Sequence, residues 1–293
     1  MKPNDNEQLT SLIHLLDDPD EEVYRHVTDK LISFGTEVIP SLEEAWEKSF
    51  DPDLHWRLEE LIHIIQFETL VKETAEWSRK KSPDILEGAI LISKYQYPDL
   101  DVFKVHQQLD NLSYEIAREM NYNTTPLEKV NVFNHVLFTL NGFAGNSEKL
   151  YDPQNHYLNY VLESKKGNPV SLAILYMILA QKLEMNVYGV KLPQHFVLSL
   201  HKNPIDDFRS EQEVRSSFVF YISPFNKGII FNRDEVSLYL RKMNIDPEAK
   251  HFLPSDNRAV IATLVQSLIA CYEYGNETEK VNELTRVMEA IER

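Results

Sequence analysis

The sequence predicts an α+β protein in which helices come first, a small antiparallel sheet follows, and two helices close the chain. Three observations support this prediction. Apolar residues recur every three to four positions over most of residues 1–185, as in amphipathic helices. Short runs of β-branched and aromatic residues replace that spacing between residues 187 and 231. The helical spacing then returns from about residue 256 to the end.

The first 80 residues contain two predicted cycles of paired helices. Each cycle is broken by an Asp-Pro-Asp triplet, at residues 18–20 and 51–53, and the two breaks lie 33 residues apart. Asp20 is suited to cap the helix that follows, and Gly35 to end it. The segment resembles a HEAT repeat, whose usual period is longer, about 40 residues. A helical bundle without repeats therefore stays open as the alternative.

The middle of the chain predicts further helices and then the sheet. We expect helices over residues 85–93, 102–120 and 126–140, and two more between residues 155 and 185. Strands are expected at residues 187–190, 195–200, 217–222 and 229–231, with an exposed connection at 203–215. Two helices joined by a Gly275-Asn276 turn form the tail. The predicted domains are residues 1–80, 81–252 and 253–293.

Composition excludes several classes of protein. The chain has 293 residues, 43% of them apolar and 26% charged, which is typical of a globular protein large enough to bury a full core. Its net charge of −16 has the wrong sign for general binding to nucleic acid or to an anionic membrane. The first residues lack the apolar segment of a signal peptide, and the strongly apolar run Val170–Ala180 is too short to span a bilayer. These features predict a soluble cytoplasmic protein.

Cysteine and histidine usage predicts no metal and no cofactor. Cys271 is the single cysteine, so neither a disulfide framework nor a cysteine-based zinc site can form. Cys271 lies among apolar residues of the tail and is expected to pack in the core. His55 and His63 are two helical turns apart, too far to hold one ion directly. Neither of the common glycine-rich phosphate-binding patterns occurs.

The negative charge is concentrated in the first third of the chain. Residues 1–100 carry 22 acidic and 10 basic side chains, a net charge of −12, whereas the remaining 193 residues have a net charge of −4. An acidic surface of this kind favours a basic partner, although acidic faces often have no role beyond solvation.

The segment Gly167-Asn168-Pro169-Val170-Ser171 has the pattern of a nucleophile at a helix start. Asn168 can cap the helix, and Pro169 suits its first position. Ser171 then falls in the first turn, where free backbone N–H groups favour a developing negative charge. His195 is expected on a following strand and Ser223 at the end of the next clear strand. This is the order of catalytic groups in papain-like folds.

Several short motifs occur in an order that resembles one known family. They are Phe133-Asn134, Gly142-Phe143-x-Gly145-Asn146, Asn155-x-x-Leu158-Asn159, Gly167-Asn168-Pro169-Val170-Ser171-Leu172, Gly189-Val190-x-x-Pro193-x-His195-Phe196 and Ser223-Pro224-Phe225-Asn226-x-Gly228. From about residue 84 onward the chain resembles the transglutaminase-like superfamily, in its bacterial branch related to the Sir-B invasion-regulator proteins. The resemblance implies a papain-like core and a tetratricopeptide-like tail at residues 253–293.

The same resemblance implies a degenerate catalytic triad. The nucleophile position falls on Ser171, the histidine position on His195 and the acid position on Ser223, where the superfamily uses Cys, His and Asp. A serine needs a well-placed base, and that base needs an orienting carboxylate; loss of the carboxylate in a serine triad costs about 10⁴-fold in turnover. Asp206, Asp207 and Asp234 are candidate substitutes for it. The departures predict a pseudoenzyme.

Each candidate residue has a structural interpretation beside the functional one. In this interpretation we expect Ser171 to bond backbone groups of the first turn, His195 to lie half-buried in a strand, and Ser223 to end a strand. Asn155, Asn159 and Gln194 are candidates for lining the cleft, and the two asparagines equally for bonds between helices. The leading hypothesis is a non-catalytic binder of a protein or peptide. The alternatives are a Ser171–His195 hydrolase or acyl transferase acting on peptides or amides, and a small-molecule binder that uses the vestigial cleft.

Overall fold

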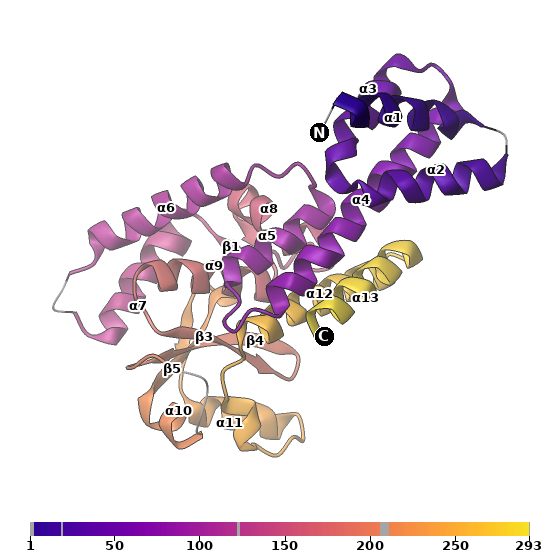
Figure 1. The fold of residues 1–293 in the computed structure, drawn as a ribbon. Coiled ribbons are helices and arrows are strands. Elements are labelled where there is room, and N and C mark those ends of the chain that lie inside the picture. Colours follow the sequence, from indigo (N-terminus) through magenta and orange to yellow (C-terminus); the bar gives the residue numbers. More distant parts are fainter. Residues whose placement is uncertain (1–2, 19, 122–123, 206–210, 293) are drawn as a thin grey trace. The chain divides into compact units, whose positions relative to one another are not determined.

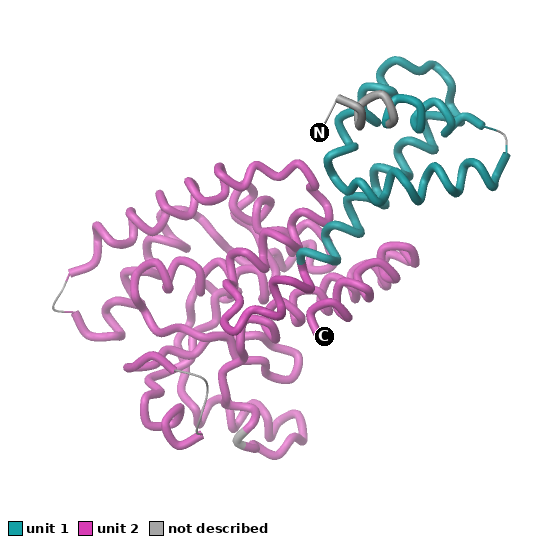
Figure 2. Tube along the Cα trace, in the orientation of Figure 1, with its two compact units in different colours: residues 1–73 teal, residues 74–293 magenta. Residues whose placement is uncertain are grey.

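A computed structural model describes residues 3–18, 20–121, 124–205 and 211–292. The chain divides into two compact units, residues 1–73 and 74–293 (Figure 2). The fold class is α+β, as predicted: the elements are mostly helical, with one small antiparallel sheet (Figure 1). Within the described residues, no helix combines the length and apolarity needed to cross a bilayer.

The first unit consists of helices around a core of its own. The α-helices are α1 (Pro3–His14), α2 (Glu21–Ser33), α3 (Ile39–Lys48) and the long α4 (Pro52–Ser78), which continues past the unit boundary. Asp20 caps α2, as expected, by accepting a hydrogen bond from the backbone N–H of Glu22. Arg57 of α4 donates to the carbonyl of Leu16 at 2.6 Å. It thereby satisfies a backbone group at the end of the first helical segment.

The second unit begins with the end of α4 and adds helices before, within and after the sheet. The α-helices are α5 (Ile85–Gln96), α6 (Val102–Glu119), α7 (Pro126–Asn134), α8 (Leu158–Ser164), α9 (Pro169–Lys182), α10 (Glu211–Ser217), α11 (Arg233–Lys242), α12 (Asn257–Tyr274) and α13 (Thr278–Glu292). Every residue from Val170 to Ala180 of α9 is buried. An all-round apolar helix of this kind belongs in the centre of a domain, and α9 is the central helix of this one.

The main sheet is antiparallel, in the order β3 (Val187–Leu192), β4 (His195–His201), β5 (Phe218–Ser223) and β6 (Ile229–Phe231). Strand side chains alternate between its two faces. Val197 points to the face that packs with Val236 and Leu240 of α11. Phe196 points to the opposite face, where its ring and Val260 of α12 lie close to Gly189. Helices therefore cover both faces.

Four features of the second unit differ from the predicted elements, and one of them is helix α11, which was not predicted. The expected helix over residues 126–140 ends at Asn134 and continues as a π-turn over His135–Leu140. A short parallel pair, β1 (Ala144–Gly145) with β2 (Lys166–Gly167), was not predicted. The expected connection at 203–215 contains the start of α10.

Candidate functional site: the start of helix α9

The first turn of α9 is held by a reciprocal pair of side-chain caps. The Asn168 carbonyl oxygen Oδ1 accepts hydrogen bonds from the backbone N–H groups of Val170 and Ser171, at 2.9 and 2.7 Å. In return, the Ser171 hydroxyl accepts one from the Asn168 backbone N–H at 3.0 Å. Pro169 occupies the first helical turn, as the sequence predicts. The capping that was expected of Asn168 is therefore present.

The hydroxyl of Ser171 is buried and also donates a hydrogen bond. It lies 2.6 Å from the backbone carbonyl oxygen of Asn155, and the residue is only 2% exposed. A Cβ atom on Gly167 would come within 2.7 Å of this hydroxyl oxygen, so the chain passes very close to it. The one proton that Ser171 can donate is thus directed at a backbone carbonyl, which cannot act as a base.

Helix α12 covers the polar groups around the start of α9. Ser267 of α12 lies 3.5 Å from the Asn168 side-chain nitrogen and 3.0 Å from Nε2 of His156. Asn155, His156, Asn168 and Ser171 are all buried, none of them more than 2% exposed. The polar groups at this helix start are therefore shielded from solvent.

A buried histidine and the single cysteine lie beside this helix start. Nδ1 of His156 is 3.1 Å from the carbonyl oxygen of Pro153, which can only accept, so Nδ1 carries the proton. Nε2 is then the acceptor for the Ser267 hydroxyl and lies 3.9 Å from the sulfur of Cys271. Burial lowers the pKa of His156 to about 4 and raises that of Cys271 to about 11. Both groups are therefore neutral near pH 7, and the thiol is not activated.

His156 was not singled out from the sequence. His156 and Cys271 are 115 residues apart in the sequence, and no local pattern indicates that their side chains are in contact.

His195 opens strand β4 on the α11 side of the sheet. It is paired with Leu192 across the β3–β4 turn and lies two residues before Val197. Strand residues two positions apart share a face, so His195 lies on the face that α11 covers. Its exposed ring lies 5.1 Å from the ring of Tyr239 in α11, measured between centroids. Among the described residues, no hydrogen bond joins His195 to Ser171, and no carboxylate pairs with its ring.

Ser223 and the candidate substitute acids have separate environments. The Ser223 hydroxyl accepts a hydrogen bond from the side-chain nitrogen of Asn226 at 2.9 Å, within the turn that follows β5. Asp234 is exposed in the first turn of α11, and within the described chain no hydrogen bond or ion pair connects it to His195. Asp206 and Asp207 lie outside the described residues.

The three residues predicted to line the cleft have different positions. Asn155 is fully buried, and its side chain bonds Asn146 at 2.9 Å and the carbonyl of Lys149 at 2.6 Å. Gln194 is exposed in the β3–β4 turn, where its φ is 61°. Asn159 lines a cavity of about 410 Å³ between the α5–α6 connection, α6 and α8. Its buried side-chain oxygen has no hydrogen-bond partner among the described residues.

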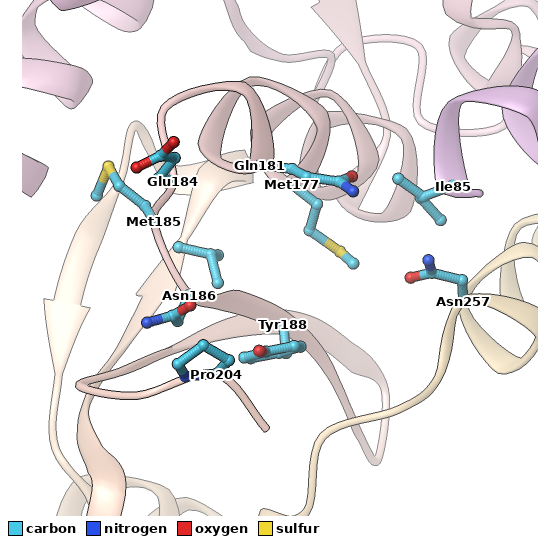
Figure 3. A pocket seen from close by; sticks show the side chains of 10 residues that line it. Ile85, Met177, Gln181, Glu184, Met185, Asn186, Tyr188, Pro204 and Asn257 are labelled. Carbon is cyan, nitrogen blue, oxygen red and sulfur yellow. The ribbon is translucent and has the colours of Figure 1, made fainter. Parts of the chain in front are cut away.

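A larger cavity lies at the other end of α9 (Figure 3). It has a volume of about 520 Å³. Its walls come from the last turns of α9, the start of β3, Pro204, and the first residues of α5 and α12. The lining residues are Ile85, Met177, Gln181, Glu184, Met185, Asn186, Val187, Tyr188, Pro204 and Asn257.

The described part of the chain shows no metal centre. Nowhere in it do three or more His, Cys, Asp or Glu side chains form a group that could hold an ion.

Comparison with known proteins places the middle of the chain in a family. Residues 103–266 match the family described as the transglutaminase-like superfamily. A UPF0162 protein of Xylella fastidiosa strain 9a5c is 27% identical over 202 residues, which are 67% of each chain. A UPF0162 protein of Vibrio cholerae is 27% identical over 147 residues, half of each chain. The chain thus spans between half and two thirds of these relatives.

A more distant similarity links the chain to an animal protein. Human F-box only protein 21 is 27% identical over 135 residues, which are 39% of this chain and 22% of that protein. No solved structure matches the chain.

Proposed function

Because the chain belongs to the transglutaminase-like superfamily yet buries the hydroxyl at its predicted nucleophile position, we propose that it is a non-catalytic protein- or peptide-binding protein. The observation that carries this proposal is the use of the Ser171 hydroxyl. It accepts from the Asn168 N–H and donates to the Asn155 carbonyl, at 3.0 and 2.6 Å. A nucleophilic serine must instead donate to a base.

The surroundings of His195 support the same proposal. A general base in a serine triad is oriented by a carboxylate. Among the described residues, the ring of His195 has an aromatic neighbour, Tyr239, and no carboxylate partner. The hydrolase alternative requires Ser171 to leave two hydrogen bonds and to reach a histidine on the α11 face of the sheet. If the described residues supply no orienting acid, the triad also loses about 10⁴-fold in turnover.

We infer further that the chain belongs to the branch related to the Sir-B invasion-regulator proteins. The ordered motifs between Phe133 and Gly228 support this inference, as does a helical pair formed by α12 and α13 where a tetratricopeptide-like tail is expected. The paired helices of the first unit are proposed to be HEAT-like. Both kinds of helical repeat present surfaces suited to binding extended peptides.

The Asn159 cavity is the proposed contact for a peptide in this region. A buried oxygen without a partner costs free energy of about 1–3 kcal/mol unless a donor reaches it. Backbone N–H groups of a peptide are such donors, and they reach this buried oxygen once the Asn159 side chain turns into the cavity. Lys104 and Glu163 both line this cavity and form an ion pair with each other at 2.8 Å. Lys104 is therefore not an unpaired cation at the rim.

A labelling experiment tests whether Ser171 is inert. The full-length protein is treated with a fluorophosphonate, and labelled peptides are mapped by mass spectrometry. We expect no label on Ser171. We also expect Ser171→Ala to lower the free energy of unfolding by about 1–3 kcal/mol, because it leaves buried backbone groups without partners. Labelling of Ser171 that disappears in Ser171→Ala would overturn the proposal.

A binding experiment tests the positive half of the proposal. Peptides selected from a random display library on the full-length protein are measured by fluorescence anisotropy. We expect binding to weaken in Asn159→Leu and to persist in Gln107→Leu, a matched change on the exposed side of α6. If no selected peptide binds this protein more tightly than it binds an unrelated acidic protein, the peptide-binding proposal fails.

A further inference from the structure

We propose that the cavity at the C-terminal end of α9 is a binding site for an aromatic group that carries an amide or ammonium donor. This site is separate from the predicted catalytic cleft, because Ser171 lies in the first turn of α9 whereas Met177 and Gln181 lie toward its end. Its volume, about 520 Å³, falls within the usual range for small-molecule sites. The proposal holds whether or not the chain turns over a substrate.

The apolar part of the cavity favours an aromatic ring. Ile85, Met177 and Val187 are 2%, 5% and 7% exposed and belong to the protein core. Met177 and Met185 both line the cavity; in Figure 3 the Met177 thioether projects into it, whereas that of Met185 points away from Met177. Thioethers make favourable contacts with aromatic rings. The ring of Tyr188 forms a further wall that can stack with another ring in an offset arrangement.

The polar part of the cavity favours hydrogen-bond donors. In Figure 3 the carboxamide of Gln181 projects from α9 and that of Asn257 from the start of α12, with the Met177 thioether between them. The Asn257 nitrogen already donates to the carbonyl of Pro83 at 2.9 Å, so its oxygen remains to accept. This leaves an acceptor next to an apolar surface, which suits an amide or ammonium group on a ring.

Charge distinguishes between possible ligands. Of the ten described lining residues, Glu184 is the one with a charged side chain. Among these ten residues an anionic ligand would therefore meet a carboxylate and no cation, whereas an ammonium group gains a partner. Since Glu184 is exposed, the expected gain is small.

The walls are fixed by hydrogen bonds in the structure as it stands. The Tyr188 hydroxyl accepts from the backbone N–H of Ile205 at 2.9 Å, and the Asn186 side chain donates to the carbonyl of Lys202 at 3.3 Å. Together with the Asn257–Pro83 bond, these contacts hold three walls before any ligand arrives. A preformed site loses less conformational entropy on binding.

Methionine NMR provides a direct test on the full-length protein. With [methyl-¹³C]methionine labelling, phenethylamine, phenylacetate and the blocked peptide acetyl-Ala-Phe-Ala-amide are titrated separately. We expect phenethylamine to shift the methyl signals of Met177 and Met185 and to leave those of Met120, Met243 and Met288 in place. Phenylacetate is expected to bind more weakly. Binding of the blocked peptide would assign the site to a peptide side chain; binding of the free amine alone would assign it to a small molecule.

Two variants locate the effect. Glu184→Gln should weaken the binding of phenethylamine about two- to fivefold, as removal of an exposed ion pair does. It should leave the binding of the blocked peptide unchanged. Gln181→Trp should fill the cavity and abolish the shift at Met185, whereas Gln107→Trp on α6 should not. The proposal is wrong if neither phenethylamine nor the peptide shifts Met177 and Met185, if the shifts persist in Gln181→Trp, or if phenylacetate binds as well as phenethylamine.

Discussion

At the scale of single residues, burial decides what the polar groups near α9 can do. Ser171, Asn168 and Asn155 have ordinary chemical reactivity in water, but here each one satisfies a buried backbone or side-chain group. Removing such a bond leaves its partner unsatisfied, which costs more than the bond itself is worth. Side chains committed in this way stabilise the domain and are poorly placed to react.

His156 makes stability depend on pH. Its pKa is lowered by burial to about 4, against about 6.5 in the unfolded chain. Between these values the unfolded chain binds a proton that the native protein does not, so stability is full above pH 6.5 and falls as the pH drops toward 4. One such group changes the free energy of unfolding by about 1.4 kcal/mol per pH unit in this window.

The measurement is urea unfolding at several pH values between 7.5 and 4.5. His201, whose pKa burial also lowers to about 4, should act in the same direction. His156→Gln is therefore expected to reduce the dependence on pH without removing it. An unchanged slope in His156→Gln would show that His156 does not cause the acid sensitivity.

The sequence was sufficient for the caps at this scale but not for the long-range bonds. Asn168 and Ser171 are three residues apart, and their reciprocal bonds follow from a local pattern. The bond from Ser171 to Asn155 joins residues 16 positions apart, and the contact between Cys271 and His156 joins residues 115 apart. Such partners are set by how helices pack, which a local pattern does not contain.

At the scale of elements, the motifs that identify the family meet one another in space. Asn134 at the end of α7 donates to the carbonyl of Gly228 at 2.8 Å and accepts from the Tyr176 hydroxyl at 3.1 Å. Gly145 of β1 lies against the ring of Phe225, which follows β5. These residues therefore join α7, α9 and the sheet. These contacts give the motif residues a structural role.

Gly145→Ala tests this structural role. A Cβ atom there would lie 2.6 Å from carbons of the Phe225 ring, so the ring or the strand must move. We expect a loss of about 1–3 kcal/mol in the free energy of unfolding, as for other overpacked sites. Gly275→Ala is the matched control, because its nearest contact would be 3.5 Å and its φ is −79°. Equal effects of the two changes in urea unfolding would contradict the expectation.

Helix α11 and strands β1 and β2 were not predicted from the sequence, and each omission has a physical reason. Helix α11 is only 10 residues long and buries two of them, Val236 and Leu240, which is too few for a clear period. Its capping box of Asn232 and Glu235 was the available signal. Strands β1 and β2 have two residues each, and their pairing is set by the surrounding helices, so no local pattern predicts them.

At the scale of the whole molecule, the two units differ in net charge, and the first unit has a hydrophobic core of its own. Residues 1–73 carry 18 acidic and 6 basic side chains, a net charge of −12, out of −16 for the chain. Their core is a cluster of its own that includes Leu16, Leu31 and Leu58, all fully buried. A unit with its own core can be altered by substitution without altering the core of the transglutaminase-like domain.

The separate core of the first unit predicts that its stability is local. Leu31→Ala removes a fully buried side chain of α2, which typically costs about 2–5 kcal/mol. Hydrogen exchange followed by mass spectrometry should then show faster exchange in α2, α3 and the first half of α4. Peptides from β3, β4 and β5 should exchange as in the unmodified protein.

Leu198→Ala in β4 is the reciprocal control, because Leu198 is also fully buried but belongs to the second unit. It should speed exchange in the sheet and leave α2 unchanged. The two substitutions remove the same atoms from equally buried positions, so a difference in where exchange rises reports the division of the core and not the size of the cavity. If either substitution raises exchange throughout the chain, the two units unfold together and their cores are not energetically separate.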